Sequence, residues 1–174
     1  MGLADRRNRF EALYVAHAAA VARYARRRAD EQTAADVVSE VFVVAWRRFD
    51  DVPHDALPWL LGCARRALWH HYRAVQRRGR LLERLKSVVP RVVVPVELPN
   101  TVLAGGLATL SERDREVLLL TAWDGLTTEQ AAKVLGCSPQ TFRVRAHRAR
   151  QRLADAMYAL DRPDELPSIT EVCK

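Results

Sequence analysis

Arginine residues crowd the segment from residue 142 to residue 153, FRVRAHRARQRL, and no acidic residue stands between Gln130 and Ala154 to neutralise them. Arginine donates bidentate hydrogen bonds to guanine, and clustered positive charges neutralise DNA phosphates by releasing counterions. A solvated face on a structural helix is the alternative, but an uncompensated run of arginines repels itself unless an anion is present. The segment is therefore predicted to bind DNA.

This basic segment lies on the second helix of a predicted helix-turn-helix. Thr127 and Gln130 have the spacing of a capping box that begins the first helix, and Gly136 suits its end. Ser138 and Pro139 then begin the second helix, which in such a motif can enter the major groove. The residues at core spacing on that helix are Phe142, Ala146, Ala149 and Leu153. The opposite side, with its flanks, carries Arg143, Val144, Arg145, His147, Arg148, Arg150, Gln151 and Arg152.

A second basic surface is predicted around residue 70. Its basic residues recur at steps of four, three and four: Arg66, His70, Arg73 and Arg77. Trp69 and Tyr72 lie beside them, and unstacked bases can lie on aromatic faces within a positive groove. Trp59, which precedes this surface in the sequence, is expected to pack in the core and not to contact a ligand. One surface suited to duplex DNA and one suited to opened strands favour a protein that both finds and opens a site.

Helices must position both surfaces, and the composition predicts them. The 174 residues are 49% hydrophobic, with only 7 Gly and 8 Pro. We expect an all-α fold of two small helical domains, a three-helix N-terminal bundle and a C-terminal helix-turn-helix domain, joined by a linker. The bundle helices are expected at about residues 5–28, from a Thr33 cap to residue 49, and from Pro58 to residue 78. The expected units are the N-terminal domain 1–78, the linker 79–100, the C-terminal domain 101–160 and a disordered tail 161–174.

The net charge of +7 favours a polyanionic partner, either nucleic acid or an anionic membrane. The N-terminal segment is charged, and no apolar run approaches the roughly 20 residues of a spanning helix. A cytoplasmic protein without membrane insertion is therefore expected. The three cysteines, Cys63, Cys137 and Cys173, have neither a metal-ligand spacing nor an even number for disulfides.

An enzyme is disfavoured by the residues present. His70 and His71 are adjacent, so on a helix they diverge by about 100° and cannot ligate one metal together. No carboxylate or cysteine has a convincing ligand or nucleophile spacing, and no phosphate-binding glycine loop occurs in the sequence. No cofactor, metal or catalytic residue is expected.

Four stretches together resemble bacterial sigma factors of the extracytoplasmic-function (ECF) group in the sigma-70 family. They are DVVSEVFVVAW, PWLLGCARRAL with YRAVQRR, LSERDREVLLL, and GLTTEQAAKVLGCSPQTFRVRAHRARQRL. The likeness covers roughly residues 10–78 and 107–157, in the family's order. The resemblance implies that the chain binds bacterial core RNA polymerase and promoter DNA, and that an anti-sigma factor restrains it.

The resemblance also assigns roles to residues. The polymerase-binding residues would be Asp36, Ser39 and Glu40, whose acidic groups suit a basic clamp. The residues for the melted minus-ten strand would be Arg66, Trp69, His70, Arg73 and Arg77. The residues for the minus-thirty-five duplex would be Gln140, Thr141, Arg143, Val144, Arg145, His147, Arg148 and Arg150. Val144 stands where the family commonly has a small polar residue, and it can contact a thymine methyl group.

A conventional repressor or activator is the alternative. It would bind duplex DNA as a dimer through the same helix-turn-helix, with residues 1–78 as a sensor and without polymerase. Such a protein needs a dimer interface and has no use for a strand-binding surface around residue 70. Dependence of promoter binding on polymerase separates the two hypotheses.

Overall fold

The computed structural model describes residues 3–83 and 101–161, which form seven α-helices and one 3₁₀ turn, without a strand among them. The expected all-α fold is confirmed. The N-terminal part consists of α1 (Leu3–Arg26), α2 (Glu31–Arg47), the turn η1 (Phe49–Asp51) and α3 (Ala56–Glu83). The C-terminal part consists of α4 (Thr101–Thr109), α5 (Glu112–Ala122), α6 (Thr128–Leu135) and α7 (Pro139–Asp161). Residues 84–100 of the predicted linker and 162–174 of the predicted tail lie outside the described residues.

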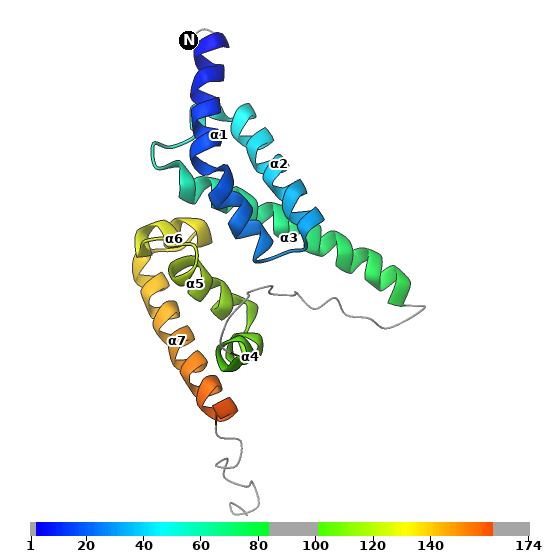
Figure 1. The fold of residues 1–174 in the computed structure, drawn as a ribbon, viewed down its shortest axis with the longest axis vertical. Helices are drawn as coiled ribbons and strands as arrows, with labels where there is room; N and C mark the ends of the chain where they lie inside the picture. Colours follow the sequence, from blue (N-terminus) through cyan, green and yellow to red (C-terminus); the bar gives the residue numbers. More distant parts are fainter. Residues whose placement is uncertain (1–2, 84–100, 162–174) are drawn as a thin grey trace, which may run out of the picture.

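The first three helices form a bundle around an apolar centre. Figure 1 shows α1 and α2 side by side, with α3 crossing both of them. Val21, Val41 and Leu60, one from each helix, are almost fully buried. These positions belong to the apolar stripes that recur every three or four residues, so burial of the stripes explains why three helices assemble here.

Two predicted helix starts in this bundle are wrong by a few residues. Asp30, not Thr33, caps α2: the backbone N–H of Thr33 donates to Asp30 Oδ1 over 2.9 Å, and the Thr33 hydroxyl donates to Oδ2 over 2.9 Å. Asp30 directly precedes the first turn of α2, so its carboxylate is better placed than the Thr33 hydroxyl to accept from the free N–H groups of that turn. Helix α3 begins at Ala56, so Pro58 lies within its first turn and not at its first position. The same helix continues past residue 78 to Glu83.

The helix-turn-helix starts and stops where its local signals predict. The Thr127 side chain accepts from Gln130 N and the Gln130 side chain accepts from Thr127 N, which completes the capping box of α6. Gly136 ends α6 with φ 64°, in the left-handed region that favours glycine. Ser138 Oγ then accepts from Thr141 N over 3.1 Å at the start of α7. The motif is therefore fixed by short-range hydrogen bonds.

Helix α4 packs closely on the C-terminal end of α7, and its two glycines allow that approach. A Cβ atom added to Gly105 would lie 2.9 Å from Leu160 Cδ1, and one added to Gly106 would lie 2.9 Å from Met157 Cγ. Arg115 of α5 stabilises the C-terminal end of α4 by donating to the carbonyl oxygens of Leu107, Ala108 and Leu110 over 2.9–3.1 Å. These bonds satisfy carbonyl groups that a helix end leaves without partners.

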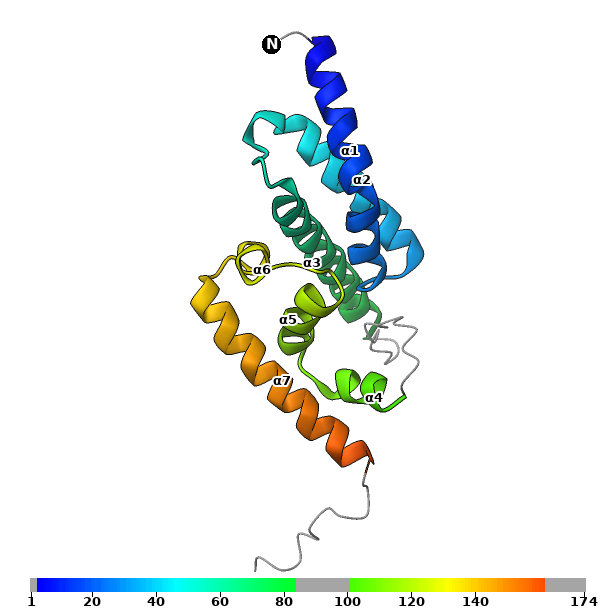
Figure 2. The same cartoon turned by 60° about the vertical axis from the view of Figure 1, so that its left-hand side comes forward.

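The buried core does not stop at the boundary between the two parts. One apolar cluster includes Tyr24 and Leu61 from the N-terminal bundle and also Leu120, Ala131 and Phe142 from the C-terminal helices. Figure 2 shows α6 lying next to the N-terminal half of α3. A second, smaller cluster joins α4, α5 and α7 through Leu107, Leu110, Leu118 and Ala149. The two predicted domains are thus packed against each other in this structure.

Candidate nucleic-acid and polymerase interfaces

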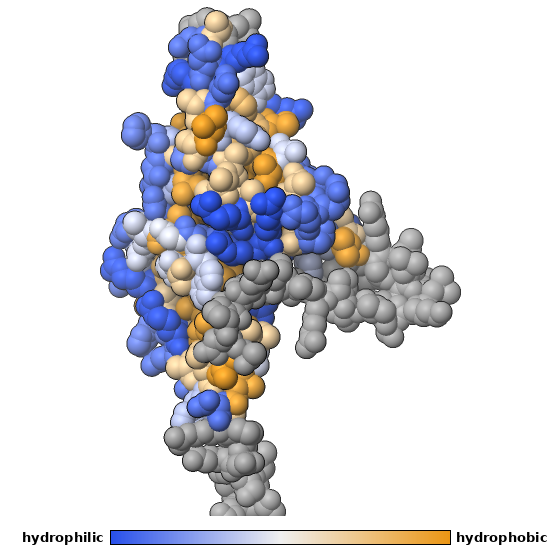
Figure 3. Space-filling view, viewed as in Figure 1, coloured by the Kyte–Doolittle hydropathy of each residue, from blue (hydrophilic) through white to orange (hydrophobic). Residues whose placement is uncertain are grey.

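Helix α7 presents its basic side to solvent because its apolar side is fully used in the core. Phe142 is 1% exposed, Ala146 4% and Ala149 0%. All eight residues expected to read duplex DNA are exposed: Gln140, Thr141, Arg143, Val144, Arg145, His147, Arg148 and Arg150. Figure 3 shows a hydrophilic outer side along α7, while apolar residues gather near its C-terminal end. The surface can therefore donate to bases and phosphates without any rearrangement of the core.

Two neighbours of this surface, Arg152 and Ser138, and one of its members, Thr141, already have partners within the chain. Arg152 Nη1 lies 2.7 Å from Asp114 Oδ2, so this arginine ties α7 to the start of α5. Ser138 Oγ and Thr141 Oγ1 lie 2.9 Å apart at the first turn of α7. The N-terminus of a helix carries partial positive charge and favours phosphate groups. The part of α7 most suited to an anionic duplex therefore consists of this helix end and the remaining arginines of the exposed face.

Helix α3 carries the second predicted surface. Arg66, Trp69, His70, Arg73 and Arg77 are all exposed, and the Trp69 side chain is 51% exposed. The Arg73 guanidinium carbon lies 4.2 Å from the centre of the Trp69 ring, and the His70 ring meets that ring edge-on at 5.3 Å. An arginine stacked on tryptophan combines an aromatic platform with a positive charge. The structure thus brings the predicted strand-binding residues together on one surface.

A cleft next to this surface contains residues that sequence reasoning did not assign to a site. It has a volume of about 330 Å³ and is lined by Pro53, Asp55, Pro58, Trp59, Gly62, Arg66 and Lys133. Trp59, expected in the core, is partly buried and packs against the core, and it also forms part of the cleft wall. The signal available in the sequence was its position about two turns before Arg66, the first residue of the basic face of α3. Lys133 comes from α6, so no pattern within α3 could have included it.

The acidic residues of α2 form a third exposed group. Asp36, Ser39 and Glu40, expected to contact polymerase, are all exposed. Ser39 Oγ donates back to the Ala35 carbonyl over 3.1 Å, and Glu40 Oε1 lies 2.8 Å from His71 Nε2 of α3. From the residues that the structure describes, the Asp36 carboxylate accepts a single long bond of 3.4 Å, donated by Gln32. Of the three, Asp36 therefore offers the carboxylate most available to a basic partner.

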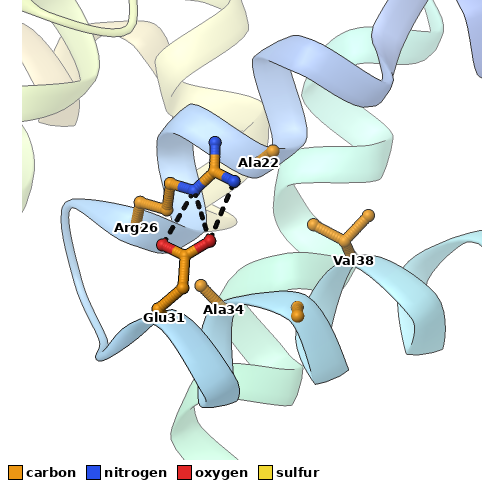
Figure 4. Close-up of a pocket in the computed structure, with 6 residues that line it drawn as sticks. Ala22, Arg26, Glu31, Ala34 and Val38 are labelled. Atoms are coloured by element: carbon orange, nitrogen blue, oxygen red, sulfur yellow. Dashed lines mark hydrogen bonds and ion pairs between the residues drawn. The ribbon is translucent and has the colours of Figure 1, made fainter.

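The hollow between α1 and α2 and the described His, Cys, Asp and Glu side chains do not form a small-molecule or metal site. The hollow between α1 and α2 in Figure 4 holds about 40 Å³, room for little more than water, and the Arg26–Glu31 ion pair of 2.9 Å lies across it. Among the described residues no group of three or more His, Cys, Asp or Glu side chains is arranged to hold a metal ion. Burial raises the pKa of Cys63, which keeps it a thiol. None of the described helices has both the length and the apolar character needed to cross a membrane.

Comparison with known proteins assigns both parts of the chain to one kind of protein. The family described as Sigma-70 region 2 matches residues 13–78, and that described as Sigma-70, region 4 matches residues 103–153. ECF RNA polymerase sigma factor SigL of Mycobacterium tuberculosis is 33% identical over 146 residues, covering 79% of this chain and 82% of SigL. RNA polymerase sigma factor CnrH of Cupriavidus metallidurans is 32% identical over 161 residues, covering 83% of this chain and 84% of CnrH.

Solved structures agree with these matches. The structure of CnrH in complex with the cytosolic domain of CnrY superposes with a TM-score of 0.62 and 28% identity, covering 88% of this chain and 90% of CnrH. The sigma factor RpoE of Bartonella quintana, solved with the anti-sigma factor NepR, shares the fold with a TM-score of 0.62 at 24% identity and coverage of 86% of this chain and 96% of RpoE. The exposed surfaces described above therefore lie on a fold that these proteins share.

Proposed function

Since the chain belongs to the ECF sigma factors of the sigma-70 family, we propose that its two basic helices divide promoter recognition between duplex and single-stranded DNA. The protein is a promoter-specific initiation factor of bacterial RNA polymerase. Within that function, α7 reads the minus-thirty-five duplex and α3 captures the melted minus-ten strand. The observation that supports this division is the different chemistry of the two exposed faces, arginine-rich on α7 and arginine with tryptophan on α3.

Duplex reading by α7 follows from its exposed donors. Arg143 and Arg148 can each donate two hydrogen bonds to guanine, and Val144, 46% exposed, can contact a thymine methyl group. Arg145 and Arg150 lie at the flanks, where phosphates of the groove walls would be neutralised. The remaining members of the proposed reading set are Gln140, Thr141 and His147.

Strand capture by α3 uses stacking as well as charge. A base that leaves the duplex loses stacking worth a few kcal/mol, and an aromatic platform offsets that loss. Trp69 supplies the platform, with Arg73 and His70 already packed on it, while Arg66 and Arg77 extend the positive charge along the helix. Capture of the strand in this way would make opening of the promoter favourable.

Polymerase docking is proposed on α2, through Asp36, Ser39 and Glu40. Complementary charge between an acidic helix and a basic clamp would speed and orient association. Bond formation is left to the polymerase. We place the protein in the cytoplasm, where polymerase and promoters meet, and we propose regulation by an anti-sigma factor because CnrH and RpoE were each solved with a partner protein. The dimeric repressor is not favoured, because residues 13–78 match sigma-70 region 2 and not a sensor domain.

Run-off transcription with purified bacterial core polymerase tests this function. On a pool of promoter fragments, the wild-type protein should direct initiation at a defined set of start sites, and core alone should not. Asp36→Arg should abolish binding to core while circular dichroism shows the fold unchanged. Asp155→Arg is the matched control, because it makes the same change of charge at an exposed residue of α7. If Asp36→Arg binds core as tightly as Asp155→Arg, the proposed docking site on α2 is wrong.

A further inference from the structure

The cleft between α3 and α6 has the size of a small-molecule site. Its volume is about 330 Å³, and such sites enclose about 300–1,000 Å³. Trp59 and Arg66 of its lining come from α3, whereas Lys133 comes from α6. Gln130, one turn before Lys133, donates to both oxygens of Asp55 over 3.3 Å and so connects the two walls. Both parts of the chain therefore build this cleft, which we call the Trp59 cleft.

The chemistry of the Trp59 cleft changes in a fixed order along α3. Asp55 immediately precedes the helix, and Trp59 follows four residues later. Gly62 and Arg66 continue the series at steps of three and four, which places them on the same side of the helix as Trp59. At about 1.5 Å per residue, Trp59 and Arg66 are about 10 Å apart along the axis, with Asp55 about one further turn away. A carboxylate, an aromatic ring, an open position and a guanidinium thus follow one another.

Gly62 keeps the space between the ring and the guanidinium open. Among the described residues, a Cβ atom added to Gly62 would meet no side chain and no other segment of backbone within 4 Å. Glycine weakens a helix relative to alanine, and here close packing does not require it. The missing side chain instead leaves room for a ligand against α3.

This order of groups matches the parts of a nucleoside phosphate. An exposed aromatic face stacks on a nucleobase, and a carboxylate accepts hydrogen bonds from the amino group of a base. Arginine and lysine both bind phosphate through charge-assisted hydrogen bonds. Asp55 can still accept from a base, because a carboxylate offers about four acceptor sites and Gln130 fills two of them.

We propose that the Trp59 cleft binds a free nucleoside phosphate, with its base stacked on Trp59 and hydrogen-bonded to Asp55, its sugar over Gly62, and its phosphate between Arg66 and Lys133. Two cations for one phosphate favour a terminal phosphate group, which carries nearly two negative charges, over the single charge of each phosphate in a strand. The site requires neither DNA nor polymerase, so it does not rest on the roles proposed for α3 and α7 at a promoter.

Isothermal titration calorimetry of the full-length protein, without DNA or polymerase, measures this binding. Guanosine 5′-monophosphate (GMP) should bind saturably at one site. It should bind at least tenfold more tightly than guanosine or inorganic phosphate, because neither of these engages both the aromatic ring and the two cations. Uridine 5′-monophosphate (UMP) should bind at least fivefold more weakly than GMP, since uracil has no amino group to donate to Asp55.

Two variants test the position of the ligand. Gly62→Leu should weaken GMP binding at least tenfold, because the new side chain occupies the open position while every charged group stays in place. Ala12→Leu is the matched control, since it adds leucine at an exposed position of α1. Lys133→Gln should weaken binding about fivefold through the loss of one cation. Its control is Arg65→Gln, which removes one positive charge from an exposed residue of α3 that does not line the cleft.

Each result has a distinct meaning once circular dichroism has shown that the variants are helical. No saturable GMP binding by the wild-type protein overturns the proposal, even if a single-stranded oligonucleotide binds. Equal affinity for GMP and inorganic phosphate would mean an anion site only, and equal affinity for GMP and UMP would remove Asp55 from the site; each overturns the proposal.

The variants decide where the ligand lies. If Gly62→Leu binds GMP as tightly as Ala12→Leu, the ligand lies outside the Trp59 cleft and the proposal is wrong. If Gly62→Leu does not fold, the comparison of Lys133→Gln with Arg65→Gln decides in the same way. Failure of the proposed promoter function appears separately, as the absence of run-off transcription with the wild-type protein, and leaves the calorimetric result unaffected.

Discussion

The basic faces of α3 and α7 carry similar charge, but the residues that lie beside the charged side chains differ. On α3, Trp69 is half exposed and is in contact with the side chains of Arg73 and His70. On α7, no tryptophan, tyrosine or phenylalanine occurs from Arg143 to Leu153, so the arginines of this segment have no aromatic residue interspersed among them. A paired base presents only its edge, which arginine can read, whereas an unpaired base presents a face, which an aromatic ring can stack upon. The difference teaches that the aromatic residues, and not the charge, distinguish the helix proposed to bind the single strand from the helix proposed to read the duplex.

Loss of the core side chain beneath α7 should have the largest effect, because it should lower both the stability of the protein and its binding to duplex DNA. Phe142 is 1% exposed and anchors the helix, so Phe142→Ala should lower the free energy of unfolding by about 3–5 kcal/mol. Urea denaturation measures this loss, and binding to a duplex minus-thirty-five fragment should fail with it. Phe142→Leu, which removes less volume, is the control and should cost less than half as much. A loss below about 1 kcal/mol for Phe142→Ala would mean that the apolar side of α7 does not position its basic side.

Removal of the aromatic platform on α3 should have the next largest effect. Trp69→Ala should weaken binding of the minus-ten strand by about 1–3 kcal/mol for each base that it stacks, which is roughly 5- to 150-fold. Permanganate footprinting of the open complex and strand-binding titrations measure the loss. The minus-thirty-five duplex should bind as it does to wild type. Trp69→Phe keeps a stacking face and should retain most of the activity; equal loss in both variants would show that stacking is not the role of this side chain.

The sequence predicted those features that depend on neighbours within a few residues. The Thr127–Gln130 capping box, the left-handed Gly136 and the Ser138 cap are each made by residues three or four positions apart, and the structure confirms all three. The burial of Phe142, Ala146 and Ala149 was likewise predicted from helical spacing. The prediction that Thr33 caps α2 was wrong, because Asp30 three residues earlier is an equally good cap and only the backbone conformation decides between such residues.

Features made by residues far apart in the chain were beyond sequence reasoning. Arg28 and Glu116 are 88 positions apart, and nothing in the periodicity of α1 or α5 pairs them. Trp59 was expected in the core and does pack against it, but the cleft that it also lines exists only where α6 meets α3. The apolar cluster that crosses the domain boundary has the same origin. Local signals therefore determine each helix, while the packing of domains depends on contacts that a single sequence does not reveal.

The finest distinction lies within α7, between the arginines proposed to read bases and those proposed to hold phosphates. Arg148 is on the side opposite the core, so Arg148→Ala should cost about 1–3 kcal/mol at one base pair and relax sequence preference there. Arg145 lies on the flank, so Arg145→Ala should weaken binding to all sequences alike and reduce the slope of log K against log salt by about 1. Titration of both variants against duplexes that differ at single positions, at several salt concentrations, separates the two effects. If Arg148→Ala weakens all duplexes equally, it is a phosphate contact, and base reading by α7 must depend on Arg143, Val144 and His147.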